Sequence, residues 1–314
     1  MDISISIVNY NTKGLLKICL ESIFRNLKND LKYEVIVADN NSADESLKLA
    51  KTFFTSVRYI ENKMNLGFAK ATNQTIRISQ ARYILLLNPD TEVIDGAIQR
   101  MYAFMEECGD IGILGSKLIM PGNIIHMNCS PYPWLLFLLE NPLNLFRLPR
   151  WIRERIALSR WDYASVRDVD WLLGSCLMVR KEVFDKIGLL DERFFMYTED
   201  MELCYRAKKS GFRITYMPNA EILHHQNISG SKEFGDKKRI IEYISVQKLF
   251  SKYKGSIGLL LGFTSHITGI ICKISFYALY AMVVPKKGKY LRESVRLNLT
   301  VLIQIIKLGP KPEY

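Results

Sequence analysis

The sequence predicts an α/β fold of the doubly wound type, with a mostly parallel sheet covered by helices. Short aliphatic runs alternate with runs of helical spacing, and the links between them are short. Residues 83–87 are mostly aliphatic without a polar interruption, which is typical of a strand buried on both faces of a parallel sheet. Pro89 follows, and proline cannot continue a central strand. These three observations carry the prediction.

The first half of the chain supplies the elements in order. Strands are expected at 3–8, 33–38, 57–60 and 83–87. Asn11 or Thr12 is expected to cap the first helix. Ser42, with Glu45 three residues later, has the spacing of a capping box for the second helix. A third helix is expected to end near Ser79.

Polar turns at 9–12, 39–44 and 88–92 follow three of these strands. The carboxyl ends of parallel strands meet at one edge of a sheet, and ligands of open α/β sheets bind there. The turn after the first strand contains no Gly-x-Gly-x-x-Gly, which disfavours a dinucleotide-binding fold. The chain also contains no Gly-x-x-x-x-Gly-Lys-Ser/Thr, which excludes a P-loop.

The turn at 39–44 and the segment 65–69 are candidates for holding a nucleotide. Asp39 either accepts hydrogen bonds from a nucleoside or caps a helix, and we favour the nucleoside because Ser42 already fills the capping role. Residues 65–69 either bring a helix N-terminus and a glycine backbone to a diphosphate, or form an ordinary loop.

Asp90 lies just past the carboxyl end of a strand, in the turn Asn88-Pro89-Asp90. A carboxylate at this position suits a hard divalent cation shared with a diphosphate. The alternative is ordinary turn chemistry, because Asn-Pro-Asp is also a good turn sequence. The two neighbouring polar turns favour the metal site.

From about Ile111 the alternation of strands and helices is lost. Further strands are expected at 112–115, 169–180 and 212–217, with a short helix at 181–187. Residues 133–161 have the composition of an insertion in which tryptophan and leucine alternate with arginine. This segment is either a lid or lipid-facing surface, or a packed helical excursion.

A second polar cluster spans residues 198–206. Thr198 is expected to cap a helix whose first turn contains Glu199 and Asp200. Glu202 and Arg206 are four residues apart, so a structural salt bridge between them is expected. The helix dipole would lower the pKa of a first-turn carboxylate, keeping it ionised and able to accept a proton from an alcohol. The alternative is that these acids only satisfy the dipole.

Composition separates a neutral body from a basic tail. Residues 1–231 carry 28 basic and 27 acidic side chains, whereas residues 232–314 carry 15 and 5. A basic, apolar tail favours an anionic membrane surface, and no nucleic-acid module is present in it, so we expect no nucleic-acid partner. The six cysteines form no Cys-x-x-Cys pair, which indicates a reducing compartment. The N-terminus begins at once with a strand-like pattern, so we expect no signal peptide.

The tail has two apolar stretches, within residues 255–308. Residues 257–272 contain no charged side chain, and residues 291–306 are amphipathic. A spanning helix needs about 20 apolar residues, and this length is reached here only with Lys273 and His266 inside it. We therefore favour helices lying in the membrane plane over a true span. A soluble oligomer interface, with a homo-oligomer, is the other alternative.

Seven motifs in this order resemble the family 2 glycosyltransferases, and in particular their bacterial rhamnosyltransferase-like branch. The resemblance covers roughly residues 1–230. The motifs are Ile7-Val8-Asn9-Tyr10-Asn11, Val37 to Ser42, Asn65 to Ala69 with Asn73, Leu87-Asn88-Pro89-Asp90, Trp171 to Gly174, Glu199-Asp200-x-Glu202-Leu203-x-x-Arg206, and His224 followed by Ser229. Members are inverting enzymes with the GT-A nucleotide-sugar fold.

The resemblance implies a role for each motif. Asp200, with Glu199 beside it, would be catalytic, as the general base. Asp90 would be the aspartate of an Asp-x-Asp metal motif, but Asn88 stands where many relatives have the first aspartate. His224 would therefore help Asp90 to hold Mg²⁺ or Mn²⁺. Trp171 and Gly174 would face the acceptor. The donor nucleotide sugar would contact Asn9, Asn11, Asp39, Asn41, Asn65, Gly67, Asn73, Asn88 and Asp90.

The expected organisation is a nucleotide-sugar half (1–114), an acceptor and catalytic half of the same GT-A domain (115–235), and a helical membrane-associating tail (236–314). The expected reaction moves a sugar from dTDP-rhamnose to a polyprenyl-linked saccharide in cell-surface polysaccharide synthesis, at the cytoplasmic face of the bacterial membrane. A UDP-sugar donor is the first alternative. A nucleotidyltransferase and an inactive membrane scaffold are the others.

Overall fold

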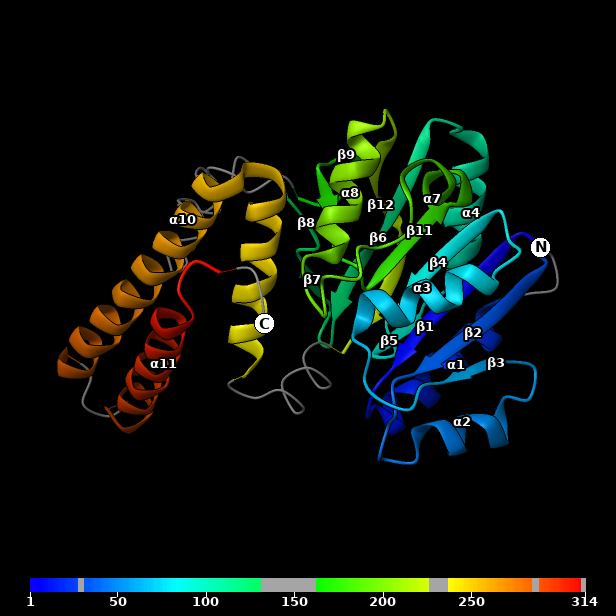
Figure 1. Cartoon of the computed structure of the whole chain (residues 1–314). Helices are drawn as coiled ribbons and strands as arrows, with labels where there is room; N and C mark the ends of the chain where they lie inside the picture. The colour runs from blue at the N-terminus through cyan, green and yellow to red at the C-terminus, as the bar shows by residue number, and fades with distance from the viewer. Residues whose placement is uncertain (28–30, 131–161, 226–236, 284–287, 312–314) are drawn as a thin grey trace. The chain divides into compact units, whose positions relative to one another are not determined.

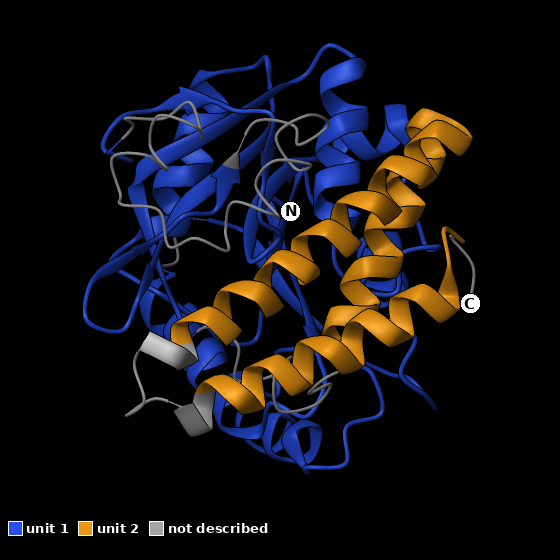
Figure 2. Cartoon of the chain, turned by 90° about the vertical axis from the view of Figure 1, so that its left-hand side faces the viewer, with its two compact units in different colours: residues 1–131, 162–233 blue, residues 132–161, 234–314 orange. Residues whose placement is uncertain are grey.

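The computed structural model describes residues 1–27, 31–130, 162–225, 237–283 and 288–311 (Figure 1). The chain divides into two compact units (Figure 2). Unit 1 contains the described residues of 1–131 and 162–233, and unit 2 contains the described residues from 237 onward. The insertion predicted at 133–161 lies outside the described residues.

The first part of unit 1 is a run of parallel strands with helices between them, as the sequence predicts. Its strands are β1 (Ile3–Asn9), β2 (Tyr33–Asp39), β3 (Arg58–Glu61) and β4 (Tyr83–Leu87). Its helices are α1 (Lys13–Asn26), α2 (Ser46–Phe53) and α3 (Phe68–Ile78). The strands lie side by side in the order β3-β2-β1-β4, and every pair is parallel. Their carboxyl ends therefore share one edge of the sheet.

The second part of unit 1 contains strands that pair in both directions, parallel and antiparallel. The strands are β5 (Thr91–Val93), β6 (Ile111–Met120), β7 (Ile124–His126), β8 (Cys129–Ser130), β9 (Arg167–Asp168), β10 (Trp171–Leu172), β11 (Cys176–Arg180) and β12 (Arg213–His224). The helices are α4 (Ala97–Glu107), α7 (Lys181–Ile187) and α8 (Glu199–Lys209).

These strands make the sheet mixed rather than mostly parallel. Strand β11 is antiparallel to both β4 and β6, β12 is parallel to β6, and β5 is antiparallel to β12. In the described part of the chain the sheet has ten strands, including β7 and β9 at its margins. The single strand expected at 169–180 is two strands, because β10 leaves the sheet to pair with β8. The break between β10 and β11 contains Gly174.

Strand β12 is a single long strand that ends at His224. Its register against β6 shifts between Met217 and Glu221, where Pro218 lies. Proline has no N–H to donate to the ladder, so a bulge at this point is expected. Beyond the bulge β12 pairs with β5, which places His224 opposite Thr91 and next to Asp90.

The hydrophobic core of unit 1 is formed by aliphatic side chains that its strands and helices bury between them. Ile5, Leu85 and Met178 lie on three neighbouring strands, are each fully buried, and belong to one cluster with residues of α1 and α4. Burial of a Leu, Ile or Met side chain contributes roughly 1.5–3 kcal/mol. This core fixes the strand ends that carry the polar residues.

Unit 2 consists of α10 (Lys237–Val283) and α11 (Gly288–Leu308). Helix α10 is two helices joined at Gly255, whose φ of 59° and ψ of −146° are not helical. The part before Gly255 packs against both later helical segments through a cluster that includes Tyr243, Ile270 and Val301. The Tyr243 hydroxyl also donates to the carbonyl of Gly309 at 2.7 Å. Unit 2 therefore has a small core of its own.

Candidate active site

The ends of β1 and β2 form a buried polar network. The parallel register pairs Asn9 with Asp39, and both side chains are buried. Asn9 Nδ2 donates to Asp39 Oδ1 at 2.6 Å and to Ser46 Oγ at 2.7 Å. Thr12 Oγ1 donates to Asn9 Oδ1 at 2.5 Å. The predicted donor-binding pair is thus brought together at the sheet edge.

Ser42 belongs to this network and does not cap a helix, so the predicted capping box is wrong. Its backbone N–H donates to Asp39 Oδ2 at 2.9 Å, and its hydroxyl donates to Asp39 Oδ1 at 2.6 Å. Helix α2 begins only at Ser46, after Glu45 in the left-handed conformation. The capping argument for a nucleoside role of Asp39 therefore falls, and that role stays a prediction.

Asp44 supplies caps that the sequence assigns to other residues. Its Oδ2 accepts from the N–H of Lys13, the first residue of α1, at 2.7 Å. Its Oδ1 accepts from the N–H of Ser46 at 3.0 Å. Thr12 occupies the N-cap position of α1 without a side-chain cap bond, whereas Asn11 Oδ1 accepts from Ala43 N–H at 2.8 Å. These contacts tie the first two polar turns together.

The turn 39–44 also has a residue in the left-handed region. Asn41 has φ 64° and an exposed side chain. The position tolerates asparagine well, because its short polar side chain costs little there. A donor contact for Asn41 stays a prediction.

Gly67 is needed for close packing at the start of α3. Its φ is +83°, and a Cβ atom there would lie 2.4 Å from the carbonyl oxygen of Phe195. The N–H of Phe68 donates to the same oxygen at 2.7 Å, and Asn65 Oδ1 accepts from Gly67 N–H at 2.9 Å. The first N–H of this helix is thus directed to the loop before α8. A diphosphate contact for Asn65 and Gly67 stays a prediction.

Asn73 anchors the same loop from the next turns of α3. Its Nδ2 donates to the Leu190 carbonyl at 2.8 Å, and its Oδ1 accepts from Leu190 N–H at 3.0 Å. It is buried, and Glu192 Oε1 is a further acceptor at 3.0 Å. These bonds hold the loop to α3, and a donor contact for Asn73 stays a prediction.

Asp90 and His224 meet at the candidate metal site. Both are buried, and Asp90 Oδ1 lies 3.4 Å from His224 Nε2. The carbonyl of Asp90 accepts from the N–H of His225 at 2.9 Å, which holds the turn against β12. The His225 ring in turn contacts Glu92 at 2.5 Å. The strand end therefore positions both predicted ligands.

The Asp90 carboxylate and the His224 imidazole fit a metal ion that is also coordinated by a diphosphate. Ligand distances of about 2.0–2.2 Å for nitrogen and oxygen donors allow two ligand atoms 3.4 Å apart to occupy neighbouring positions on one ion. Among the described residues, no group of three or more His, Cys, Asp and Glu is gathered to hold a metal. Asn88 Nδ2 instead donates to Ser175 Oγ at 3.3 Å. An ion here would need diphosphate oxygens and water to complete its shell.

His126 is a neighbour of this site that the sequence alone does not reveal. It lies at the end of β7, and its ring stacks on His224 with centroids 5.1 Å apart. Burial, with the neighbouring His224, lowers the pKa of His126 to about 4, while Asp90 acts in the opposite direction. His126 is therefore neutral at pH 7. The spacing of residues in the sequence does not predict that His126 pairs with Leu118 in a hairpin.

Asp200 is fixed by two backbone donors at the start of α8. The N–H of Gly174 donates to its Oδ2 at 2.7 Å, and the N–H of Met201 donates to its Oδ1 at 2.7 Å. A Cβ atom on Gly174 would lie 3.3 Å from Asp200 Cβ, so glycine allows this close approach. The predicted acceptor-side residue Gly174 thus contacts the predicted base directly.

The pKa values of the two acids move opposite to the expected direction. Burial raises the pKa of Asp200, although its bonds to the Gly174 and Met201 N–H groups work against the shift. Burial and the charge of Asp200 raise the pKa of Glu199 well above its usual range. The expected lowering by the helix dipole is wrong, because the cost of desolvating a carboxylate exceeds it here.

At the start of α8 and on β10, which packs against this helix, three buried polar atoms have no hydrogen-bond partner among the described residues. They are Trp171 Nε1, Thr198 Oγ1 and Glu199 Oε2. Thr198 is the N-cap residue of α8 but is in the left-handed conformation with φ 67°, so its hydroxyl makes no cap bond and the predicted cap is wrong. Buried unsatisfied groups are costly and often mark functional sites.

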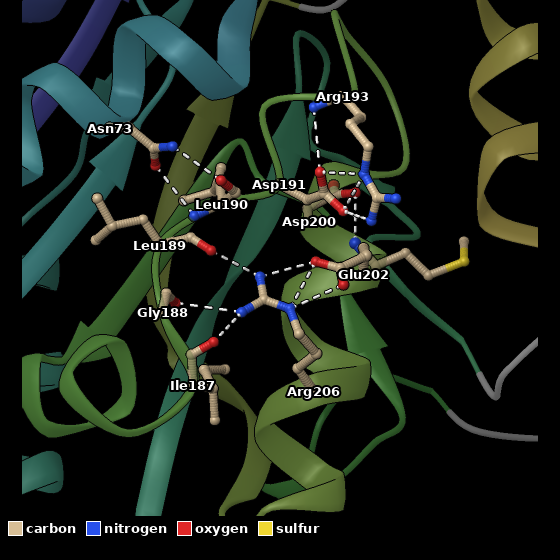
Figure 3. Close-up of polar contacts among 11 residues, drawn as sticks. Asn73, Ile187, Gly188, Leu189, Leu190, Asp191, Arg193, Asp200, Glu202 and Arg206 are labelled. Atoms are coloured by element: carbon tan, nitrogen blue, oxygen red, sulfur yellow. Dashed lines mark hydrogen bonds and ion pairs between the residues drawn. The ribbon is translucent and has the colours of Figure 1, made fainter. Parts of the chain in front are cut away.

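Glu202 and Arg206 form the predicted salt bridge (Figure 3). Arg206 Nε donates to Glu202 Oε1 at 2.8 Å, and the Glu202 side chain is fully buried. The same guanidinium donates to the carbonyls of Ile187, Gly188 and Leu189. Arg206 therefore joins the end of α7 to α8, and Asn73 holds the next residue of that loop to α3 (Figure 3).

Comparison with known proteins gives this arrangement its context. Residues 4–159 match the family model described as glycosyl transferase family 2. The chain is 30% identical over 218 residues to the N-acetylglucosaminyl-diphospho-decaprenol L-rhamnosyltransferase of Mycobacterium tuberculosis, covering 63% of this chain and 68% of that protein. It is 25% identical over 238 residues to the rhamnosyltransferase WbbL of Escherichia coli, covering 70% and 82%.

A solved structure shares the fold. The mannosyltransferase PcManGT from Pyrobaculum calidifontis, in complex with GDP-Man and Mn²⁺, superposes with a TM-score of 0.57 at 14% sequence identity. The match covers 97% of this chain and 85% of that chain. The expected GT-A-type α/β fold is thus confirmed, together with the long apolar C-terminal helix. The chain belongs to glycosyl transferase family 2, in its rhamnosyltransferase-like branch, and is a glycosyltransferase.

Proposed function

We propose that the chain is a metal-dependent, inverting glycosyltransferase that moves a sugar from a nucleoside-diphosphate sugar to a hydroxyl of a lipid-linked saccharide. One observation carries the proposal. Asp200 is held in place by the N–H groups of Gly174 and Met201, and burial raises its pKa. A fixed carboxylate with a raised pKa suits general-base catalysis near neutral pH.

Asp200 would act in a single displacement. As the acceptor oxygen attacks the anomeric carbon, its proton passes to Asp200 and the bond from that carbon to the diphosphate oxygen breaks. One displacement inverts the configuration at the anomeric carbon. Glu199 would stay protonated beside Asp200, because two adjacent buried carboxylates resist carrying two charges. A single negative charge would then be available for the proton transfer.

Asp90 and His224 would hold Mg²⁺ or Mn²⁺ against the diphosphate. When bound, a divalent ion neutralises the charge that builds up on the departing nucleoside diphosphate. Support comes from the burial of both side chains and their separation of 3.4 Å at a strand end. The similar fold of PcManGT was solved with GDP-Man and Mn²⁺.

The proposed donor is dTDP-rhamnose, with a UDP-sugar as the alternative. The names of the relatives from Mycobacterium tuberculosis and Escherichia coli support a rhamnose donor. The donor would lie along the edge formed by the ends of β1, β2 and β4, near Asp39 and Asp90. Of the predicted donor contacts, Asn11 and Asn41 belong to turns on this edge.

The proposed acceptor is a polyprenyl-linked saccharide reached from the cytoplasmic face of a bacterial membrane. The mycobacterial relative is named for a decaprenol-linked acceptor. Helix Lys238–Tyr280 is apolar enough to cross a membrane by length and composition, with a mean hydropathy of 1.6 in its most apolar window. Only 22% of that window is buried, and Gly255 breaks the helix, so we favour unit 2 lying in the plane of the membrane.

Asp200→Asn tests the proposal. The substitution keeps the shape and removes the proton acceptor, so we expect sugar transfer to fall by about 10²–10⁴-fold while nucleotide-sugar binding persists. Transfer is followed with radiolabelled dTDP-rhamnose and a decaprenyl-linked acceptor, and nucleoside diphosphate release is measured with and without EDTA. Unchanged turnover would contradict the base assignment, and release that EDTA does not affect would contradict the metal requirement. No release from any nucleotide sugar would favour an inactive scaffold.

A further inference from the structure

The His224 ring approaches His126 through Nδ1 and Asp90 through Nε2. The two Nδ1 atoms are 3.1 Å apart, whereas His224 Nε2 faces Asp90 at 3.4 Å. The rings are nearly parallel, with an interplanar angle of 26°. Among the described residues, Asp90 and His126 are the two polar partners of the His224 ring. Each ring nitrogen of His224 therefore has one partner.

The strand register brings His126 to this place. In the hairpin formed by β6 and β7, His126 pairs with Leu118, and Leu118 pairs with Ile222 of β12. His224 is two residues beyond Ile222, so its side chain projects from the same face of the strand. The β6–β7 hairpin thus delivers a second imidazole to the metal-site edge of the sheet.

The contact between the two Nδ1 atoms couples the tautomers of the two rings. Only one of two nitrogens 3.1 Å apart can carry the shared hydrogen. If His126 donates, His224 must carry its own hydrogen on Nε2, and an Nε2–H cannot bind a metal. If His126 accepts, the hydrogen is on His224 Nδ1 and the Nε2 lone pair faces Asp90.

We propose that His126 is a positioning residue that accepts a hydrogen bond from His224 Nδ1–H and so selects the tautomer whose Nε2 binds the metal. The inference rests on the proposed metal site. His224 is 5% exposed, so without His126 its Nδ1–H would be left buried without an acceptor. Partners of this kind set the orientation and basicity of metal-binding imidazoles, and their loss typically costs about 10–100-fold in metal affinity.

Two substitutions of similar size test the proposal. His126→Asn places an amide oxygen near the position of Nδ1, whereas His126→Leu offers no acceptor. Met127→Ala is the matched control, because Met127 is 68% exposed on the same hairpin. The full-length protein is titrated with Mn²⁺ in the presence of dTDP, and free Mn²⁺ is followed by electron paramagnetic resonance. Pulsed measurements of the nitrogen-14 coupling report whether an imidazole is bound to Mn²⁺.

We expect the wild type, His126→Asn and Met127→Ala to bind Mn²⁺ with similar affinity and with nitrogen coupling. His126→Leu should bind about 10–100-fold more weakly. The role of His126 would be overturned if His126→Leu bound Mn²⁺ as tightly as the wild type. It would also be overturned if His126→Leu and His126→Asn lost the same amount of Mn²⁺ affinity. Absence of nitrogen coupling in the wild type would instead overturn the metal site itself, so the two failures are distinguishable.

A second measurement needs no substitution. In the complex of the wild type with Mg²⁺ and dTDP, two-bond proton–nitrogen correlation spectra report which nitrogen of each histidine carries hydrogen. We expect His224 to be protonated on Nδ1 and His126 to be protonated on Nε2. A His224 signal with hydrogen on Nε2 in this complex would overturn the inference, even if His126→Leu fails to fold.

Discussion

Removing the guanidinium of Arg206 is expected to destabilise unit 1 strongly. Arg206→Met keeps much of the aliphatic length but removes the partner of Glu202, whose side chain is fully buried. It also leaves the carbonyls of Ile187, Gly188 and Leu189 without this donor. Breaking a buried ion pair by removing one partner costs about 3–5 kcal/mol, because a buried charge is left uncompensated.

The assay is guanidinium chloride unfolding followed by circular dichroism, with the purified full-length protein. Arg193→Met is the matched control: Arg193 contacts Asp191 in the neighbouring loop, but its side chain is 65% exposed (Figure 3). Exposed pairs contribute about 0–1 kcal/mol, so this variant should stay close to the wild type. Equal losses of unfolding free energy for Arg206→Met and Arg193→Met would refute the reasoning, because burial would then have no effect.

Two further predictions concern the acid pair and the tail. Because folding raises the pKa of Glu199, the folded chain keeps a proton that the unfolded chain releases, so the free energy of unfolding falls as the pH rises from the unfolded pKa towards the folded pKa. Glu199→Gln should therefore raise the free energy of unfolding at neutral pH, with a gain that shrinks as the pH falls; a gain independent of pH would contradict the burial argument. Leu260 and Leu279 of unit 2 are 58% and 63% exposed. Changing both to serine should weaken binding to phosphatidylglycerol-containing vesicles at least about tenfold, because burying one leucine side chain in the membrane contributes roughly 1.5–3 kcal/mol. Ile124→Ser, exposed to 57% in unit 1, is the control for vesicle sedimentation, and unchanged binding of the double variant would contradict membrane docking through unit 2.

Local rules predicted much of the fold because its parallel half is built from local patterns. An uninterrupted aliphatic run such as 83–87 must be buried on both faces, so its position in the sheet follows from composition. The position of Asp90 after that strand, and the spacing of Glu202 and Arg206 on one helix, follow from chain geometry alone. For the same reason, the antiparallel second part of the sheet was less predictable, since β11 pairs with strands distant in sequence.

The wrong capping predictions in the first two polar turns share one physical cause. A cap rule assumes that the nearest side chain satisfies a helix N-terminus, but any acceptor that the fold brings close can do so. Asp44 does this for Lys13 across 31 positions of the sequence, and Ser42 is then free to bond Asp39. Such exchanges depend on how two turns pack together, which spacing within either turn does not contain.

Local sequence patterns already placed Asp39 and Asp90 at strand ends, whereas the extension of the last strand to His224 is seen only in the folded chain. Tertiary structure alone decided their environment. The pKa of Asp200 is raised because burial removes water from the carboxylate, and burial depends on every element packed around it. His126 reaches His224 from 98 positions away through the β6–β7 hairpin. Sequence order fixes local geometry, whereas desolvation and contacts between distant segments arise only when the chain folds.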